Sequence, residues 1–131
     1  MLRIATLAFL AATPAGADLS LLMFDQPGCI YCERWEREIG VAYDRTEEGR
    51  AAPLMRVGLR DPLPEGVTIE RRAAFTPTFV LLDDGTEVGR IEGYPGDQFF
   101  WPLLARLIED AEAGYPVRRS QRRRTPHRVP P

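Results

Sequence analysis

The sequence predicts an α/β fold in which helices pack against one mixed β-sheet. Two observations lead to this prediction. Apolar, β-prone runs at residues 19–24, 53–60, 78–82 and 86–92 are separated by turns or by segments of helical periodicity. The first two runs flank a helical segment, whereas an Asp-Gly pair at 84–85 joins the last two into a tight hairpin. The expected element order is therefore β-α-β-α-β-β-α.

The first strand and the first helix flank both cysteines of the chain. Residues 19–24 form a continuous apolar run that is typical of a buried strand, and a Pro-Gly pair then turns the chain. Helical character follows at 33–39, where Trp35 and Ile39 are one helical turn apart.

The middle of the chain is less regular. Residues 43–52 are polar and contain glycine, which favours a loop or a frayed helix end, and 53–60 alternate enough to form the second strand. A loop with two prolines follows. The spacing of Ile69 and Ala73 predicts one or two helical turns within 67–75.

The last helix is predicted at 97–113, with Gly96 or Asp97 as its N-cap and Gly114 as its C-terminal stop. Pro102 is tolerated near the start of a helix, because the first turns lack acceptors for their N–H groups. The apolar residues follow helical periodicity: Phe100, Leu103, Leu104, Leu107, Ile108 and Ala111. We expect the sheet to be covered on both faces.

Residues 1–17 have the anatomy of a cleavable secretory signal peptide. Arg3 gives a positive end, residues 4–12 form a short apolar region, and Ala15-Gly16-Ala17 provides a cleavage site. A membrane anchor is excluded because a span needs about 20 apolar residues. The mature chain is expected to begin near Asp18 in an oxidising space outside the cytoplasm, where a folded domain covers 18–113.

Charge divides the chain into an acidic domain and a basic tail. All 19 acidic residues lie in 18–113, whereas 114–131 carries six arginines and no acid. Without apolar periodicity, the tail is predicted to be disordered. It is interpreted as a solvated tail, or as a segment that docks on an acidic protein or on anionic lipid. Nucleic acid is not expected as a partner, because the signal peptide directs the chain out of the cytoplasm.

Cys29 and Cys32 are spaced as Cys-Ile-Tyr-Cys at the start of the first helix. The unpaired N–H groups and the dipole of a helix start stabilise a thiolate, and a second cysteine one turn behind can resolve a mixed disulfide. Redox chemistry is favoured over a structural disulfide and over half of a zinc site. Zinc needs four ligands, and the only other soft ligand is His127 in the tail. No metal site is expected.

Three features together resemble the thioredoxin superfamily. Residues 24–32 read Phe-Asp-Gln-Pro-Gly-Cys-Ile-Tyr-Cys, which is similar to the active-site motif of glutaredoxins. Thr76-Pro77-Thr78 precedes the third strand, where the superfamily keeps a cis-proline, and Gly93 follows the hairpin. The resemblance implies a thioredoxin-like fold of glutaredoxin size. It implies no separate cofactor, because the Cys29–Cys32 disulfide is itself the redox group.

The chain resembles most closely the SoxS group, the periplasmic thioredoxins encoded with bacterial sulfur-oxidation systems. This resemblance implies a periplasmic thiol–disulfide oxidoreductase that reduces or reactivates a cysteine-bearing partner, the SoxYZ carrier, and is recharged by a membrane electron donor. Two alternatives stay open: a reductant in cytochrome c maturation, and a non-catalytic binding module with a structural disulfide.

The resemblance also implies roles for individual residues. Cys29 would be the nucleophile and Cys32 the more buried resolving thiol. Ile30 and Tyr31 would shape the substrate-binding rim. Pro77 would pack against the dithiol and expose the Thr76 backbone, which an extended substrate could pair with.

Two positions depart from related patterns. Gln26 stands where glutathione-binding glutaredoxins usually have lysine. Met23 stands where thioredoxins place a buried acid, six residues before the first cysteine. Asp25 lies nearby, but we expect it on a different face of the strand, as a turn-forming residue.

Overall fold

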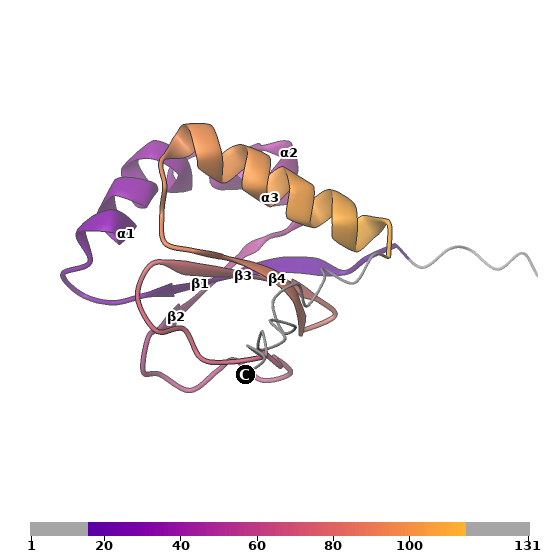
Figure 1. The fold of residues 1–131 in the computed structure, drawn as a ribbon, viewed down its shortest axis with the longest axis horizontal. Helices are drawn as coiled ribbons and strands as arrows, with labels where there is room; N and C mark the ends of the chain where they lie inside the picture. The colour runs from indigo at the N-terminus through magenta and orange to yellow at the C-terminus, as the bar shows by residue number, and fades with distance from the viewer. Residues whose placement is uncertain (1–15, 115–131) are drawn as a thin grey trace, which may run out of the picture.

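A computed structural model describes residues 16–114 of the chain. Its centre is a four-stranded mixed sheet in the order β2-β1-β3-β4 (Figure 1). The strands are β1 (Leu19–Asp25), β2 (Leu54–Gly58), β3 (Thr78–Asp83) and β4 (Thr86–Glu92). β1 and β2 are parallel, whereas β1 with β3 and β3 with β4 are antiparallel. The predicted α/β fold class and the four strands are confirmed.

The hairpin between β3 and β4 turns at the predicted Asp-Gly pair. Asp84 and Gly85 have φ angles of 48° and 78°, which a tight turn between antiparallel strands requires. Gly85 is also needed for close packing, because a Cβ atom there would lie 2.2 Å from the carbonyl oxygen of Gly66. The turn therefore holds the loop after β2 against the hairpin.

Within residues 16–114, all the helices lie on one face of the sheet (Figure 1). The first is α1 (Ile30–Trp35), which continues as a π-helical turn (Glu36–Gly40). A 3-10 turn (Tyr43–Arg45) and α2 (Glu47–Ala51) follow, and α3 (Asp97–Glu112) closes the fold. Within residues 16–114, no helix is both long and apolar enough to cross a membrane.

Both faces of the sheet are covered, but only one of them by helices. The second face carries a smaller apolar cluster of Leu22, Phe24, Val57, Val80 and Leu82. The irregular chain between β2 and β3 lies over it and contributes Leu63, Val67, Ile69 and Ala73.

The helical turns predicted at 67–75 are wrong. This segment is irregular, with bends, and Thr68 forms an isolated bridge to Thr86 at the free edge of β4. The Glu70 N–H also donates to the Glu87 carboxylate at 2.7 Å. An open strand edge therefore supplies the hydrogen bonds that a short helix would otherwise supply. Ile69 and Ala73 do share a surface, because both pack on the sheet.

The 43–52 region, for which a loop or a frayed helix end was predicted, contains a 3-10 turn and the short helix α2. The Thr46 hydroxyl accepts the Gly49 N–H at 3.0 Å and caps α2. Gly49 packs so closely that a Cβ atom would lie 1.7 Å from the Tyr43 carbonyl oxygen. The second helix of the chain thus precedes β2, where the prediction placed it after β2.

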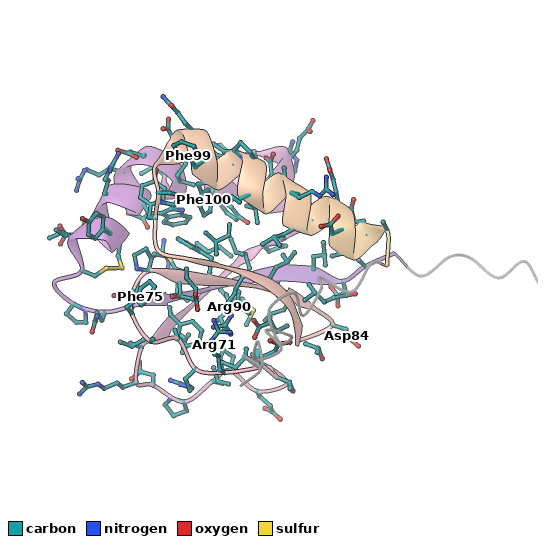
Figure 2. All side chains as sticks on the ribbon, viewed as in Figure 1. Arg71, Phe75, Asp84, Arg90, Phe99 and Phe100 are labelled. Atoms are coloured by element: carbon teal, nitrogen blue, oxygen red, sulfur yellow. A yellow bond between two sulfur atoms is a disulfide. The ribbon has the colours of Figure 1, made fainter. Side chains whose placement is uncertain are left out.

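The main core lies between the sheet and the helices and is built around aromatic rings. The ring centroid of Trp35 in α1 lies 5.2 Å from that of Phe79 in β3 and 5.9 Å from that of Phe100 in α3. Figure 2 shows Phe99 and Phe100 on different sides of α3, and only Phe100 is buried. α3 begins after Gly96 and ends before Gly114, whose φ of 68° stops it as predicted.

Candidate active site

Cys29 and Cys32 lie where β1 gives way to α1, at the carboxyl end of a central strand. They form a disulfide, and their Cα atoms are 5.2 Å apart. Cys29 is half-buried and is the N-cap of α1, whereas Cys32 is only 8% exposed. The two sulfur atoms are therefore unequal in their access to a partner.

Two N–H groups of α1 donate to Cys29. Its Sγ atom accepts the Cys32 N–H at 3.1 Å, and its carbonyl accepts the Glu33 N–H at 3.1 Å. In the reduced protein, an N–H group at this distance and the positive end of the helix would stabilise a thiolate at Cys29.

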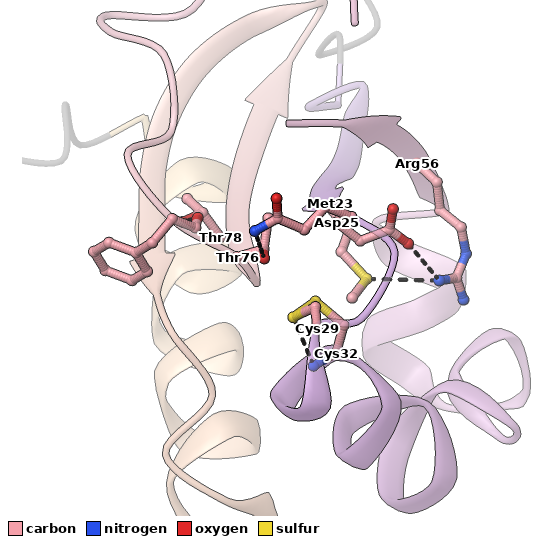
Figure 3. Close-up of a disulfide and its surroundings, with 9 residues drawn as sticks. Met23, Asp25, Cys29, Cys32, Arg56, Thr76 and Thr78 are labelled. Atoms are coloured by element: carbon pink, nitrogen blue, oxygen red, sulfur yellow. Dashed lines mark hydrogen bonds and ion pairs between the residues drawn. A yellow bond between two sulfur atoms is a disulfide. The ribbon is translucent and has the colours of Figure 1, made fainter. Parts of the chain in front are cut away.

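The loop that precedes β3 lies beside the disulfide, because β3 is antiparallel to β1 and Thr78 pairs with Phe24. Thr76-Pro77 is joined by a cis peptide bond, and Pro77 is buried. The Pro77 carbonyl accepts the Gly93 N–H at 2.8 Å, and the Thr78 hydroxyl donates to the Phe75 carbonyl at 2.8 Å. Figure 3 shows Thr76 and Thr78 on one side of Cys29 and Cys32. The fold thus brings together the two motifs that the sequence singled out.

Exposed apolar side chains belong to both motifs. Ile30 is 68% exposed and Tyr31 is 53% exposed, both in the first turn of α1. Phe75, next to Thr76, is 48% exposed, and one of its ring atoms would lie 3.8 Å from a Cβ atom at Gly93. Phe75 is the rim residue that no sequence motif assigned.

The comparisons with known proteins agree with this geometry. Residues 7–108 match the family model described as a thioredoxin-like domain. The chain belongs to the thioredoxin-like family. It is also similar to a solved structure, the reduced form of the periplasmic thioredoxin SoxS from Paracoccus pantotrophus. The two share 60% sequence identity, the TM-score is 0.71, and the match covers 72% of this chain and 100% of the other. A search of curated proteins finds no match.

Family membership and the Cys29–Cys32 pair make this thioredoxin-like protein a thiol–disulfide oxidoreductase. Its redox group is the disulfide itself. Within the part of the chain that the structure describes, no group of three or more His, Cys, Asp or Glu side chains is placed to hold a metal ion.

Beneath the disulfide, this thioredoxin-like protein has a thioether beside a cation. Met23 is fully buried, and its Sδ atom lies 3.7 Å from an Arg56 nitrogen. Arg56 also pairs with Asp25 at 3.7 Å and with Glu36. Figure 3 shows Met23 between Arg56 and the disulfide. Asp25 therefore lies on the same face of β1 as Met23, and the prediction of a different face is wrong. The two residues are two positions apart, which in a strand places them on one side.

A second polar group ties the cysteine helix to the chain that follows β4. The Tyr94 hydroxyl donates to Glu38 at 2.5 Å, and the Arg34 guanidinium donates to the same carboxylate at 2.9 Å. These bonds, first from Tyr94 and then from Arg34, lower the pKa of Glu38. Burial and the neighbouring Glu38 raise the pKa of Tyr94. The group fixes α1 relative to Gly93, which packs beside the cis-proline loop.

Gln26 links the two halves of the site directly. Its Nε2 atom donates to the Thr76 hydroxyl at 2.9 Å, across 50 positions in the sequence. In the sequence analysis, Gln26 was notable only as a missing positive charge. Its hydrogen bond shows that the residue also has a partner within the site.

Proposed function

We propose that this protein is a periplasmic thioredoxin that reduces a disulfide on a partner protein, with the SoxYZ carrier of sulfur oxidation as its natural substrate. One observation carries the proposal. A half-buried cysteine caps a helix, beside a buried cysteine and a cis-proline loop, in a chain 60% identical to a periplasmic SoxS.

The proposed reaction has two exchange steps. The Cys29 thiolate attacks the partner's disulfide, which forms a mixed disulfide and releases one partner sulfur as thiolate. The Cys32 thiolate then attacks the Cys29 sulfur, which releases the second partner thiol and forms the Cys29–Cys32 disulfide. The partner gains two electrons. An upstream electron donor in the membrane must then supply two electrons to reduce the Cys29–Cys32 disulfide again.

The rim residues supply the proposed binding surface. The exposed apolar side chains of Ile30 and Tyr31 would contact the partner beside its disulfide. No hydrogen bond involves the Thr76 backbone N–H or carbonyl within residues 16–114. An extended partner segment could pair with these groups, as a strand pairs with a sheet edge.

The test of the proposed partner uses SoxYZ with its reactive cysteine blocked as a mixed disulfide. Reduced protein should release the blocking group, and intact mass should follow the release. Insulin serves as a general protein disulfide. Reduction of insulin without release from SoxYZ would overturn the partner and leave the oxidoreductase activity in place.

The protein exported to the periplasm is expected to begin at Asp18. The Asp18 N–H donates to the Asp83 carboxylate at 3.1 Å, so cleavage after Ala17 would place the new ammonium group beside a carboxylate. Intact-mass analysis of periplasmic extract should give this N-terminus. Asp83→Asn should lower the thermal stability of the processed chain only slightly, because the pair is at the surface. A membrane-retained chain of full length would contradict the assignment.

Glutathione mixed disulfides are expected to be poor substrates compared with protein disulfides. Gln26 carries no charge, and the acidic domain should repel an anionic tripeptide. Gln26→Lys should raise turnover of a small glutathionylated substrate several-fold, most strongly at low ionic strength. A lysine keeps an N–H donor for Thr76, so insulin reduction should change less. Wild-type turnover of the glutathionylated substrate equal to that of a glutaredoxin would contradict this reading.

A further inference from the structure

We propose that Gln26 is a positioning residue that couples the nucleophile's turn to the substrate-binding loop and thereby sets the affinity for protein disulfides. The inference rests on the proposed function, because it takes the Thr76 backbone to be the site where a protein segment pairs. It assigns to Gln26 a role that depends on its side-chain amide and not on its lack of charge.

The main chain of Gln26 holds the cysteine side of the site. Its carbonyl accepts the N–H of Cys29 at 3.3 Å, across a turn in which Gly28 has a φ of 77°. A residue with a side chain is strained at that φ, so glycine allows the turn to close. The position of Gln26 is therefore set by the same turn that places the nucleophile at the start of α1.

The side chain of Gln26 contacts the substrate-binding loop on the other side of the site. Its Nε2 atom donates to Thr76 Oγ1 at 2.9 Å, and Figure 3 shows this bond ending at Thr76 beside the disulfide. The flanking residues have their own anchors, since Gly93 donates to the Pro77 carbonyl and Thr78 donates to the Phe75 carbonyl. Among the hydrogen bonds of the described residues, Thr76 is held by the Gln26 amide alone.

Loss of the Gln26–Thr76 bond should affect the stability of the fold and the binding of a partner to different degrees. The bond is exposed, so its loss should cost the fold little. Loss of the bond would, however, free the Thr76 side chain and backbone to sample other orientations in the unbound protein. A partner would then have to order them on binding, which weakens binding more than it slows sulfur exchange.

The experiment is a double-mutant cycle with Gln26→Leu and Thr76→Val, assayed by steady-state reduction of insulin. Each single variant should raise KM by about three- to tenfold, with kcat changed by less than about twofold. The double variant should be no worse than the worse single variant, because both changes remove the same bond. Thr76→Ser keeps the hydroxyl that accepts the hydrogen bond, so its KM should stay near that of the wild type.

The matched control is Gln98→Leu, the same substitution at an exposed glutamine whose side chain makes no hydrogen bond in the described chain. It should leave the KM for insulin unaltered. A small linear disulfide, too short to reach Thr76, should be affected less than insulin by Gln26→Leu. Thermal unfolding of every variant shows that each one is folded.

Three results would overturn the proposal: unaltered KM in Gln26→Leu, additive losses in the double variant, or equal losses on insulin and on the small disulfide. The last result would mean that Gln26 acts on Cys29 reactivity and not on the binding loop. Failure of the proposed partner is distinguishable, because wild-type protein would then reduce insulin but not SoxYZ. Wild-type protein inactive on every protein disulfide would overturn both proposals.

Discussion

Cys29→Ser is expected to abolish the reduction of protein disulfides, with a loss of roughly a hundredfold or more, because a serine hydroxyl is not ionised at neutral pH. Cys29 is the accessible sulfur and caps α1, where the Cys32 N–H lies 3.1 Å from its Sγ atom. The measurement is insulin reduction with dithiothreitol as the electron source, compared with the wild type. The fold should be retained, because the side chain is half-exposed and hydroxyl groups also cap helices well.

Cys32→Ser is the matched variant and should behave differently. It keeps the nucleophile but lacks the resolving thiol, so it should accumulate a mixed disulfide with the partner. Non-reducing electrophoresis and mass analysis of trapped species would identify the partner directly. If iodoacetamide at neutral pH modifies Cys32 faster than Cys29 in the reduced wild type, the two roles are reversed.

The sheet could be predicted from the sequence because local patterns specify it. The apolar runs at 19–24 and 78–82 are buried on both faces, so neither needs an alternating pattern to be recognised. The Asp-Gly pair fixes the hairpin, because both of its residues adopt positive φ angles. The four strands and the hairpin were therefore predicted correctly.

Two segments differ from the prediction, each for its own reason. Residues 67–75 have helical spacing, yet they form no helix because Thr68 and Glu70 bond to β4, which the spacing cannot reveal. In 43–52 the decisive signal was Thr46, a good N-cap that the polar composition around it concealed. Tertiary hydrogen bonds overrode the local pattern in the first case, and a cap was overlooked in the second.

In the site, too, contiguous motifs could be recognised from the sequence, whereas contacts between distant residues could not. The cysteine motif and Thr76-Pro77 were recognised because each is a contiguous motif, and the antiparallel pairing of β1 with β3 brings them together. The bond of Gln26 to Thr76 and the contact of Arg56 with Met23 join residues 50 and 33 positions apart. No periodicity or motif encodes such pairs, so they emerge only from the packed structure.

Trp35→Ala is expected to destabilise the protein by about 3–5 kcal/mol, the range for removing a fully buried large aromatic side chain. Trp35 is 0% exposed and packs on Phe79 and Phe100 between α1 and the sheet. It lies in the same helix as Cys32, so the cavity would also loosen the support of the resolving thiol. Denaturant unfolding of the oxidised protein, followed by far-ultraviolet circular dichroism, measures the loss.

Two companion variants show whether the cause is the cavity. Trp101→Ala removes the same side chain from a half-buried position, where it stacks on Tyr43, and should cost clearly less. Trp35→Phe should also cost less than Trp35→Ala, because a ring remains and the buried Nε1–H, which has no hydrogen-bond partner in the described chain, is removed. Equal losses for Trp35→Ala and Trp101→Ala would contradict the assignment of Trp35 as the centre of the core. A loss for Trp35→Phe equal to that for Trp35→Ala would contradict the cavity as the cause, because the phenyl ring fills part of the space that alanine leaves empty.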